Sequence, residues 1–162
     1  MTDNVGLGYK AGYSNTGGQA VLIGREAGYN NTANQTIAIG AYTLHLNTTG
    51  ESNTSIGIAS MRANTIGNNN TAIGGYSFRW NTEGNNNTAV GMQSLNKNTT
   101  GSYNTAQGYE SMKRNTTGNN NTGVGYQAGS VITTGSNNIM IGYEADSSAV
   151  DSSNQIVIGQ GA

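Results

Sequence analysis

The sequence predicts an all-β fold, a repetitive parallel β-roll or β-solenoid of ten coils with 16 or 17 residues each. Three observations predict it: a glycine that recurs at a fixed step, β-branched or aliphatic residues at a spacing of two before it, and turn residues in the rest of the unit. The steps between the recurring glycines are 16, 16 and then 17 seven times. These anchor glycines are Gly8, Gly24, Gly40, Gly57, Gly74, Gly91, Gly108, Gly125, Gly142 and Gly159. We therefore expect residues 1–162 to be a single repeat domain, and a piece of a longer chain.

Each anchor glycine follows a predicted short strand. Three residues before the glycine every copy is β-branched, from Val5 to Ile156, and one residue before it nine of the ten copies are aliphatic, with Gln107 as the exception. Disorder is the alternative that the glycine, asparagine and threonine content suggests, but a disordered chain has no reason to hold such a register. We predict that both columns point into the coil.

Two further columns carry small or large apolar residues. The position between the two strand columns is Gly, Ala or Ser in seven of ten copies, and the third residue after each anchor is always small, which predicts a second short strand or extended segment packed across a narrow coil. The fourth residue after the anchor is large from Leu44 to Met112. Because one coil has a thin core, we predict an oligomer, with the small column from Ala38 to Gly123 or the stripe from Leu44 to Met112 at the subunit contacts.

The rest of each unit has the chemistry of turns. Glycines from Gly50 to Gly135 are expected at corners that need a positive φ. Asparagines recur seven residues after the anchor, from Asn15 to Asn115, and again just before the strand, from Asn53 to Asn138. Stacked asparagines are able to hydrogen-bond along a ladder, so we expect these columns to hold neighbouring coils together.

Composition excludes several classes of function. Only 9% of the residues are charged and the net charge is −1, too few cations for nucleic acid, and no apolar run is long enough to insert into a membrane. The chain has no cysteine. His45 is interpreted as a solvated surface side chain, and Glu144, Asp146 and Asp151 as a solvated tip rather than a calcium site. No nucleophile, base and acid come together in the pattern, so we expect no enzyme activity, no catalytic residue, no metal and no cofactor.

The segments "NNTAIGGYS", "NNTAVGMQSL", "NTTGSYNTAQGYESM" and "NNTGVGYQAG" resemble the repeats of bacteriophage tail-fibre proteins. They are similar, more distantly, to the left-handed parallel β-roll in trimeric autotransporter heads of the YadA type, although the period of 17 here is longer. The resemblance covers Asn4 to Gly159 and implies a parallel homotrimer at the host-contacting end of a fibre, hence a virion protein that binds the cell surface. The alternative is a bacterial trimeric adhesin head on the outer cell surface.

One candidate binding surface follows from the distribution of charge. Five of the seven cations lie five or six residues after an anchor glycine, so stacking is expected to align them along one edge, where Trp80 also falls. An aromatic ring stacks on a sugar ring and cations pair with acidic sugars, which favours an anionic surface glycan as ligand. The competing interpretation is that these side chains only keep the rod soluble. The candidate residues are Arg62, Arg79, Trp80, Lys97, Lys113 and Arg114.

A third function, ice binding, is suggested by paired threonines such as Thr48 and Thr49, or Thr99 and Thr100. These pairs fall at predicted corners beside asparagine and glycine, where a flat array is hard to hold. A non-enzymatic fibre module is therefore the first prediction of function.

Overall fold

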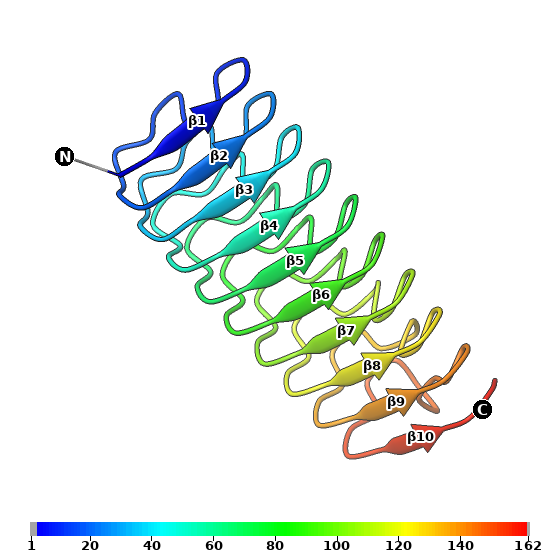
Figure 1. The fold of residues 1–162 in the computed structure, drawn as a ribbon. Helices are drawn as coiled ribbons and strands as arrows, with labels where there is room; N and C mark the ends of the chain where they lie inside the picture. The colour runs from blue at the N-terminus through cyan, green and yellow to red at the C-terminus, as the bar shows by residue number, and fades with distance from the viewer. Residues whose placement is uncertain (1–2, 162) are drawn as a thin grey trace.

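The computed structural model describes residues 3–161 as one solenoid of short parallel strands. The strands form one ten-stranded sheet in chain order, and β1 and β10 lie at opposite ends of the rod (Figure 1). No helix occurs among the described residues. The strands are β1 (Val5–Leu7), β2 (Val21–Ile23), β3 (Ile37–Ile39), β4 (Thr54–Ile56), β5 (Thr71–Ile73), β6 (Thr88–Val90), β7 (Thr105–Gln107), β8 (Thr122–Val124), β9 (Ile139–Ile141) and β10 (Ile156–Ile158).

The strands lie where the anchor glycines predict them, and equivalent residues pair. Ala72 of β5, for example, is in register with Ser55 of β4 and with Ala89 of β6. Every pairing is parallel, and each strand joins the next through one complete coil. The prediction of a parallel β-solenoid is therefore confirmed.

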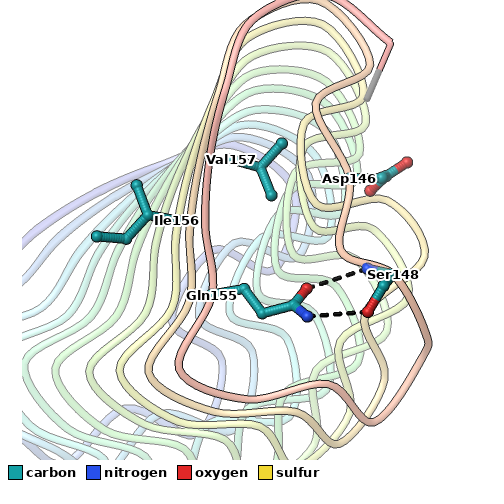
Figure 2. A pocket seen from close by; sticks show the side chains of 5 residues that line it. All are labelled: Asp146, Ser148, Gln155, Ile156 and Val157. Carbon is teal, nitrogen blue, oxygen red and sulfur yellow. Dashed lines mark hydrogen bonds between the residues drawn. The ribbon is translucent and has the colours of Figure 1, made fainter.

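The direction of the strand side chains is opposite to the prediction. Ala38, Ala72 and Ala89, each in the middle of its strand, are fully buried, whereas Ile37 and Ile73 at strand ends are 38% and 39% exposed. Figure 2 shows the same alternation in β10, where Val157 points into the coil and Ile156 points away from it. The prediction that the outer two columns face inward was wrong, because the coil is too narrow to hold large side chains from the strand as well as from the opposite turn.

The large apolar side chains of the core come from the turn that follows each anchor glycine. Leu44, Met61, Phe78, Leu95 and Met112 are fully buried and pack against the small strand residues. The small strand column and the large turn residues are thus buried inside one chain, and neither is available for a subunit contact. The prediction that one of these two columns forms the subunit interface was therefore wrong.

The segment after the anchor glycine is a double turn and not the predicted second strand. In a typical coil the second and fourth residues after the glycine both have positive φ, as in Tyr76 at 55° and Phe78 at 51°. Such backbone is costly for large side chains. It places the fourth side chain across the coil from the strand, so its burial offsets that cost.

The corner glycines are required by close packing and not by φ. No φ in the left-handed range occurs at Gly50, Gly67 or Gly84, which corrects the prediction, and the positive φ falls two residues later, at Ser52, Asn69 and Asn86. A Cβ on Gly67 would lie 2.5 Å from the carbonyl oxygen of Gly84 in the next coil. A side chain at this corner would therefore force neighbouring coils apart.

The first asparagine column forms the predicted ladder inside the rod. The Nδ2 of Asn64 donates to Oδ1 of Asn47 at 2.6 Å, and Asn81 donates to Asn64 at 2.7 Å. The ladder runs from Asn15 to Asn115 and ends at the buried Ile132, so Oδ1 of Asn115 has no partner among the described residues.

The second asparagine column links side chains to backbone. In the middle of the rod, Oδ1 of Asn70 accepts the backbone N–H of Asn87 at 2.9 Å, while its Nδ2 donates to the carbonyl of Gly84 at 2.8 Å. The same pair of bonds recurs at Asn87 and Asn104. Both ladders connect adjacent coils, so an isolated repeat would leave these amides unpaired.

The last coil departs from the repeat. Asp146 stands where the five middle coils carry a large apolar residue, and its carboxylate accepts hydrogen bonds from Ser130 Oγ and from the backbone N–H of Val131. Gln155 crosses the coil to Ser148 (Figure 2). Asp146, Ser148, Gln155, Ile156 and Val157 line a hollow of about 460 Å³ at this end of the rod, where Val157 packs against the core.

Candidate assembly face and binding edge

The outward face of the sheet is an uncharged strip that runs the length of the rod. Its aliphatic members are exposed or half-buried, for example Ile73 at 39% and Ile141 at 38%. The residues of this outer sheet face are Val5, Leu7, Val21, Ile23, Ile37, Ile39, Thr54, Ile56, Thr71, Ile73, Thr88, Val90, Thr105, Gln107, Thr122, Val124, Ile139, Ile141, Ile156 and Ile158.

Five consecutive threonines occupy one column of the outer sheet face in the middle of the rod, from Thr54 to Thr122. Within residues 3–161 no side-chain hydrogen bond engages their hydroxyl groups. The first threonine of each corner pair differs, because the hydroxyl of Thr48 donates to the carbonyl of Thr65 at 2.9 Å, and the pattern continues along that column. Within residues 3–161 the longest regular row of unengaged threonine hydroxyl groups therefore lies on the sheet.

The six predicted binding residues all lie along the turn edge, but they line three different hollows, two of which share Lys97. Arg62 and Arg79 line one of about 330 Å³, together with Tyr42, Ile58 and Tyr76. The guanidinium carbon of Arg79 is 5.2 Å from the centre of the Tyr76 ring and 4.7 Å from that of Trp80. Both cations are half-buried, and Arg79 packs on two aromatic rings, so its guanidinium is not a freely mobile surface charge.

The second hollow, of about 270 Å³, contains Lys97, Lys113 and Arg114 with Glu110. Nζ of Lys113 is 2.6 Å from Oε1 of Glu110, so the charge of this lysine is balanced. The hydrogen bond from Lys113 is the main reason why the pKa of Glu110 is lowered, and a further one comes from Gln127. Lys97 and Arg114 are the exposed cations of this group.

The third hollow is a groove of about 520 Å³ between Trp80 and Lys97. Ala63, Thr82, Thr99 and Thr116 complete its lining, which is almost entirely apolar. Trp80 is 45% exposed. The structure therefore brings Trp80 to Lys97 in one groove, whereas Arg79 contacts the Trp80 ring from the neighbouring hollow that it lines with Arg62.

Two stacks of aromatic rings were not predicted. Tyr109, Tyr126 and Tyr143 stack with ring centres 5.3 and 5.1 Å apart. They occupy the first position after successive anchor glycines, so their shared place in the repeat was the signal that could have identified the stack. The charge of nearby Glu110 raises the pKa of Tyr109 above its ordinary value, and that of Glu144 does the same for Tyr143.

His45 belongs to the other stack and is not the solvated side chain that was predicted. Its ring lies 5.1 Å from that of Tyr29, which in turn stacks on Tyr13, and its Nδ1 is 3.6 Å from Glu26 Oε2. The side chain is only 16% exposed. The ring is therefore packed between aromatic neighbours and a carboxylate.

Side chains that are able to hold a metal do not gather in this molecule. Over residues 3–161 no three His, Cys, Asp or Glu side chains come together at one place. Glu144 and Asp151 are exposed, whereas Asp146 binds Ser130 and Val131, so the predicted acidic tip is solvated only in part.

The described part of the chain has no helix that is long and apolar enough to cross a membrane. Comparison of the chain with protein-family models, with curated proteins and with solved structures gives no match.

Proposed function

We propose that the chain is a non-enzymatic structural and adhesion module of a parallel homotrimeric fibre, of the kind that bacteriophages carry at the host-contacting end of their tails. The observation that carries this proposal is the outer sheet face, which is continuous and uncharged over all ten strands. In this proposal the module belongs to a virion and contacts a glycan or another receptor on the host surface.

The dimensions of the outer sheet face favour a protein partner. Nine steps of about 4.8 Å and three residues per strand give a strip about 43 Å long and about 10 Å wide. Contiguous apolar patches larger than a few hundred Å² mark interaction sites on soluble proteins. A second copy of the chain offers an equally long strip with the same spacing and no charge to desolvate. The number three comes from the resemblance to trimeric fibre and adhesin repeats.

The hydrogen bonds between coils support a mechanical role for the rod, or a role as a spacer. Backbone hydrogen bonds and two asparagine ladders join each coil to the next, so hydrogen bonds connect neighbouring coils at the strand, at the turn and at the corner. Little in the molecule supports catalysis, since the titratable side chains are engaged in ion pairs and aromatic contacts or are solvated.

The experiment is light scattering on the purified chain and on two arginine variants. Ile73 lies on the outer sheet face and is 39% exposed, whereas Ile66 lies at a corner and is 47% exposed. Ile73→Arg is expected to dissociate the oligomer, because it places a charge in a dry contact, and Ile66→Arg is expected to leave it intact. A wild-type chain that is a folded monomer at micromolar concentration would contradict the proposal.

A second candidate function, ice binding, is favoured by one observation. The row from Thr54 to Thr122 presents unengaged hydroxyl and methyl groups on a flat sheet at strand spacing. This function and assembly compete for the same face. Ice binding would be favoured if the chain is monomeric and shows thermal hysteresis, and if Thr88→Arg abolishes that hysteresis. A trimeric chain without thermal hysteresis would exclude ice binding.

A further inference from the structure

We propose that the groove beside Trp80 binds one ring of an acidic sugar at the edge of the rod. This groove is lined by Ala63, Trp80, Thr82, Lys97, Thr99 and Thr116. Its volume of about 520 Å³ is within the range of small-molecule sites. The inference rests on the proposed function, since it names the ligand class that a host-contacting fibre would take.

The groove exists because one position of the repeat changes size from coil to coil. Ala63, Trp80 and Lys97 occupy the sixth position after three successive anchor glycines. Backbone hydrogen bonds hold these turns side by side, from Ala63 to Arg79 at 2.9 Å and from Trp80 to Asn96 at 3.1 Å. The small Ala63 therefore leaves a gap next to the large indole ring.

The base of the groove is apolar because the hydroxyl groups of its threonines are hydrogen-bonded to the backbone. The Oγ1 atoms of Thr82, Thr99 and Thr116 donate to carbonyl oxygens of the following coils at 3.2, 3.1 and 3.0 Å. The part of each side chain that remains to face the groove is its methyl group. A row of methyl groups beside an indole suits the apolar C–H face of a pyranose ring.

Arg79 holds the indole ring in place. Its guanidinium carbon lies 4.7 Å from the ring centre, and Arg79 does not line the groove itself. Trp80 nevertheless remains 45% exposed, so a ring surface is left for a ligand. The contact orients Trp80 before binding, which lowers the entropy cost of stacking a sugar on it.

The charge at the rim selects an acidic sugar. Lys97 and, one coil further, Arg114 are exposed, and neither takes part in the ion pairs found among residues 3–161. A carboxylate on the sugar would pair with Lys97 in a charge-assisted hydrogen bond.

The test uses the fluorescence of Trp80, because the chain has one tryptophan. The probes are a sialic-acid-terminated oligosaccharide, an oligouronate and a neutral gluco-oligosaccharide, each titrated into the purified chain at low and high salt. We expect saturable changes in emission with an acidic probe, weakening with salt, and at most a weak change with the neutral one.

Binding of the acidic probe to variants is measured by calorimetry, since Trp80→Ala removes the reporter. Trp80→Ala and Lys97→Ala are expected to lower the affinity about tenfold or more, which corresponds to the loss of a single good contact. The matched controls are Met92→Ala, another exposed apolar residue, and Arg25→Ala, another exposed cation, and both are expected to bind within about twofold of wild type.

Three results would overturn the proposal: no response to either acidic probe up to its solubility limit, equal binding of the neutral probe, or unchanged affinity in Trp80→Ala and Lys97→Ala. Light scattering on the same samples separates this outcome from the fate of the proposed function. A monomeric chain that binds the sugar would contradict the proposed fibre function and support the proposed sugar site. A trimeric chain that does not bind the sugar would contradict only the sugar site.

Discussion

Leu22 occupies the space that a side chain on Gly28 would need: a Cβ on Gly28 would lie 2.6 Å from Cδ2 of Leu22. The same exchange occurs near the other end of the rod, where a Cβ on Gly129 would lie 2.6 Å from Cε of Met140. In the middle coils the sizes are reversed, with a small strand residue such as Ala72 and a large turn residue such as Phe78. An inward glycine thus faces a large side chain of its own coil, as at Gly28, or of the next coil, as at Gly129, so the inward positions of stacked coils share one limited volume.

Gly28→Ala is expected to lower the free energy of unfolding by about 2–4 kcal/mol, through overpacking against Leu22 and through its positive φ. Gly75→Ala is the matched control, because a Cβ there would meet nothing closer than 3.4 Å and its φ is not in the left-handed range. Urea unfolding measures both variants, and a Gly75→Ala change as large as that of Gly28→Ala would contradict the explanation.

The shared volume leads to a second prediction for Leu22 and Gly28. Leu22→Ala removes the obstacle to a side chain at position 28, so the double variant Leu22→Ala/Gly28→Ala is expected to lose less stability than the sum of the two single changes. The expected difference is about 1 kcal/mol or more. Simple additivity in urea unfolding would show that the two positions do not compete for space.

The asparagine ladder is expected to tolerate change at its end but not in its middle. Asn81→Leu leaves Oδ1 of Asn64 without a donor and removes one of the two acceptors of Nδ2 of Asn98, and an orphaned buried group costs about 1–3 kcal/mol. Ile132→Asn lengthens the ladder and supplies a donor to Oδ1 of Asn115, which offsets the lost apolar burial, so its effect should stay within about 1 kcal/mol. Thermal or urea unfolding compares the two, and equal losses would contradict the ladder.

The contact between Glu110 and Lys113 predicts a loss of stability in acid. The pKa of Glu110 is lowered from its ordinary value of 4.5, so the contact stabilises the fold above about pH 4.5 and is lost as the pH falls through the folded-state pKa. Glu110→Gln is therefore expected to be less stable than wild type at pH 7 and equally stable in acid. Glu83→Gln, at an exposed carboxylate, is the control, and a constant Glu110→Gln deficit across the pH range would contradict the prediction.

The reversed direction of the strand side chains is tested by two neighbouring residues. Ala89→Arg places an unpaired charge in the core and is expected to prevent folding, whereas Thr88→Arg lies on the outer sheet face and is expected to give a folded chain that fails to assemble. Far-ultraviolet circular dichroism and light scattering distinguish the outcomes. A folded Ala89→Arg variant would contradict the burial of this column.

The sequence was sufficient to predict the strands but not the side of the sheet that forms the core. The anchor glycines and the β-branched columns placed all ten strands, and the asparagine columns predicted the ladders. The hydrophobic pattern predicted that Ile73 faces the core and that Ala72 lies on the opposite face. In the structure Ala72 is buried in the core and Ile73 is exposed. A single-chain pattern does not distinguish a residue buried in its own coil from one suited to burial against another chain.

The candidate site was predictable only in outline. Spacing aligned Arg62, Trp80 and Lys97 along one edge, but it does not show which hollow each side chain lines, and Lys97 lines two of them. The apolar groove base also depends on threonine hydroxyl groups that turn toward the backbone, which no local pattern shows.

The central claim is that the outer sheet face joins copies of this chain. The chain has no cysteine, so Thr88→Cys on this face and Ile66→Cys at a corner each introduce a unique thiol. The direct measurement is the yield of disulfide-linked dimer on mild oxidation. The claim predicts rapid crosslinking of Thr88→Cys in a parallel oligomer and little of Ile66→Cys, and it would be contradicted if Thr88→Cys crosslinked no faster than Ile66→Cys.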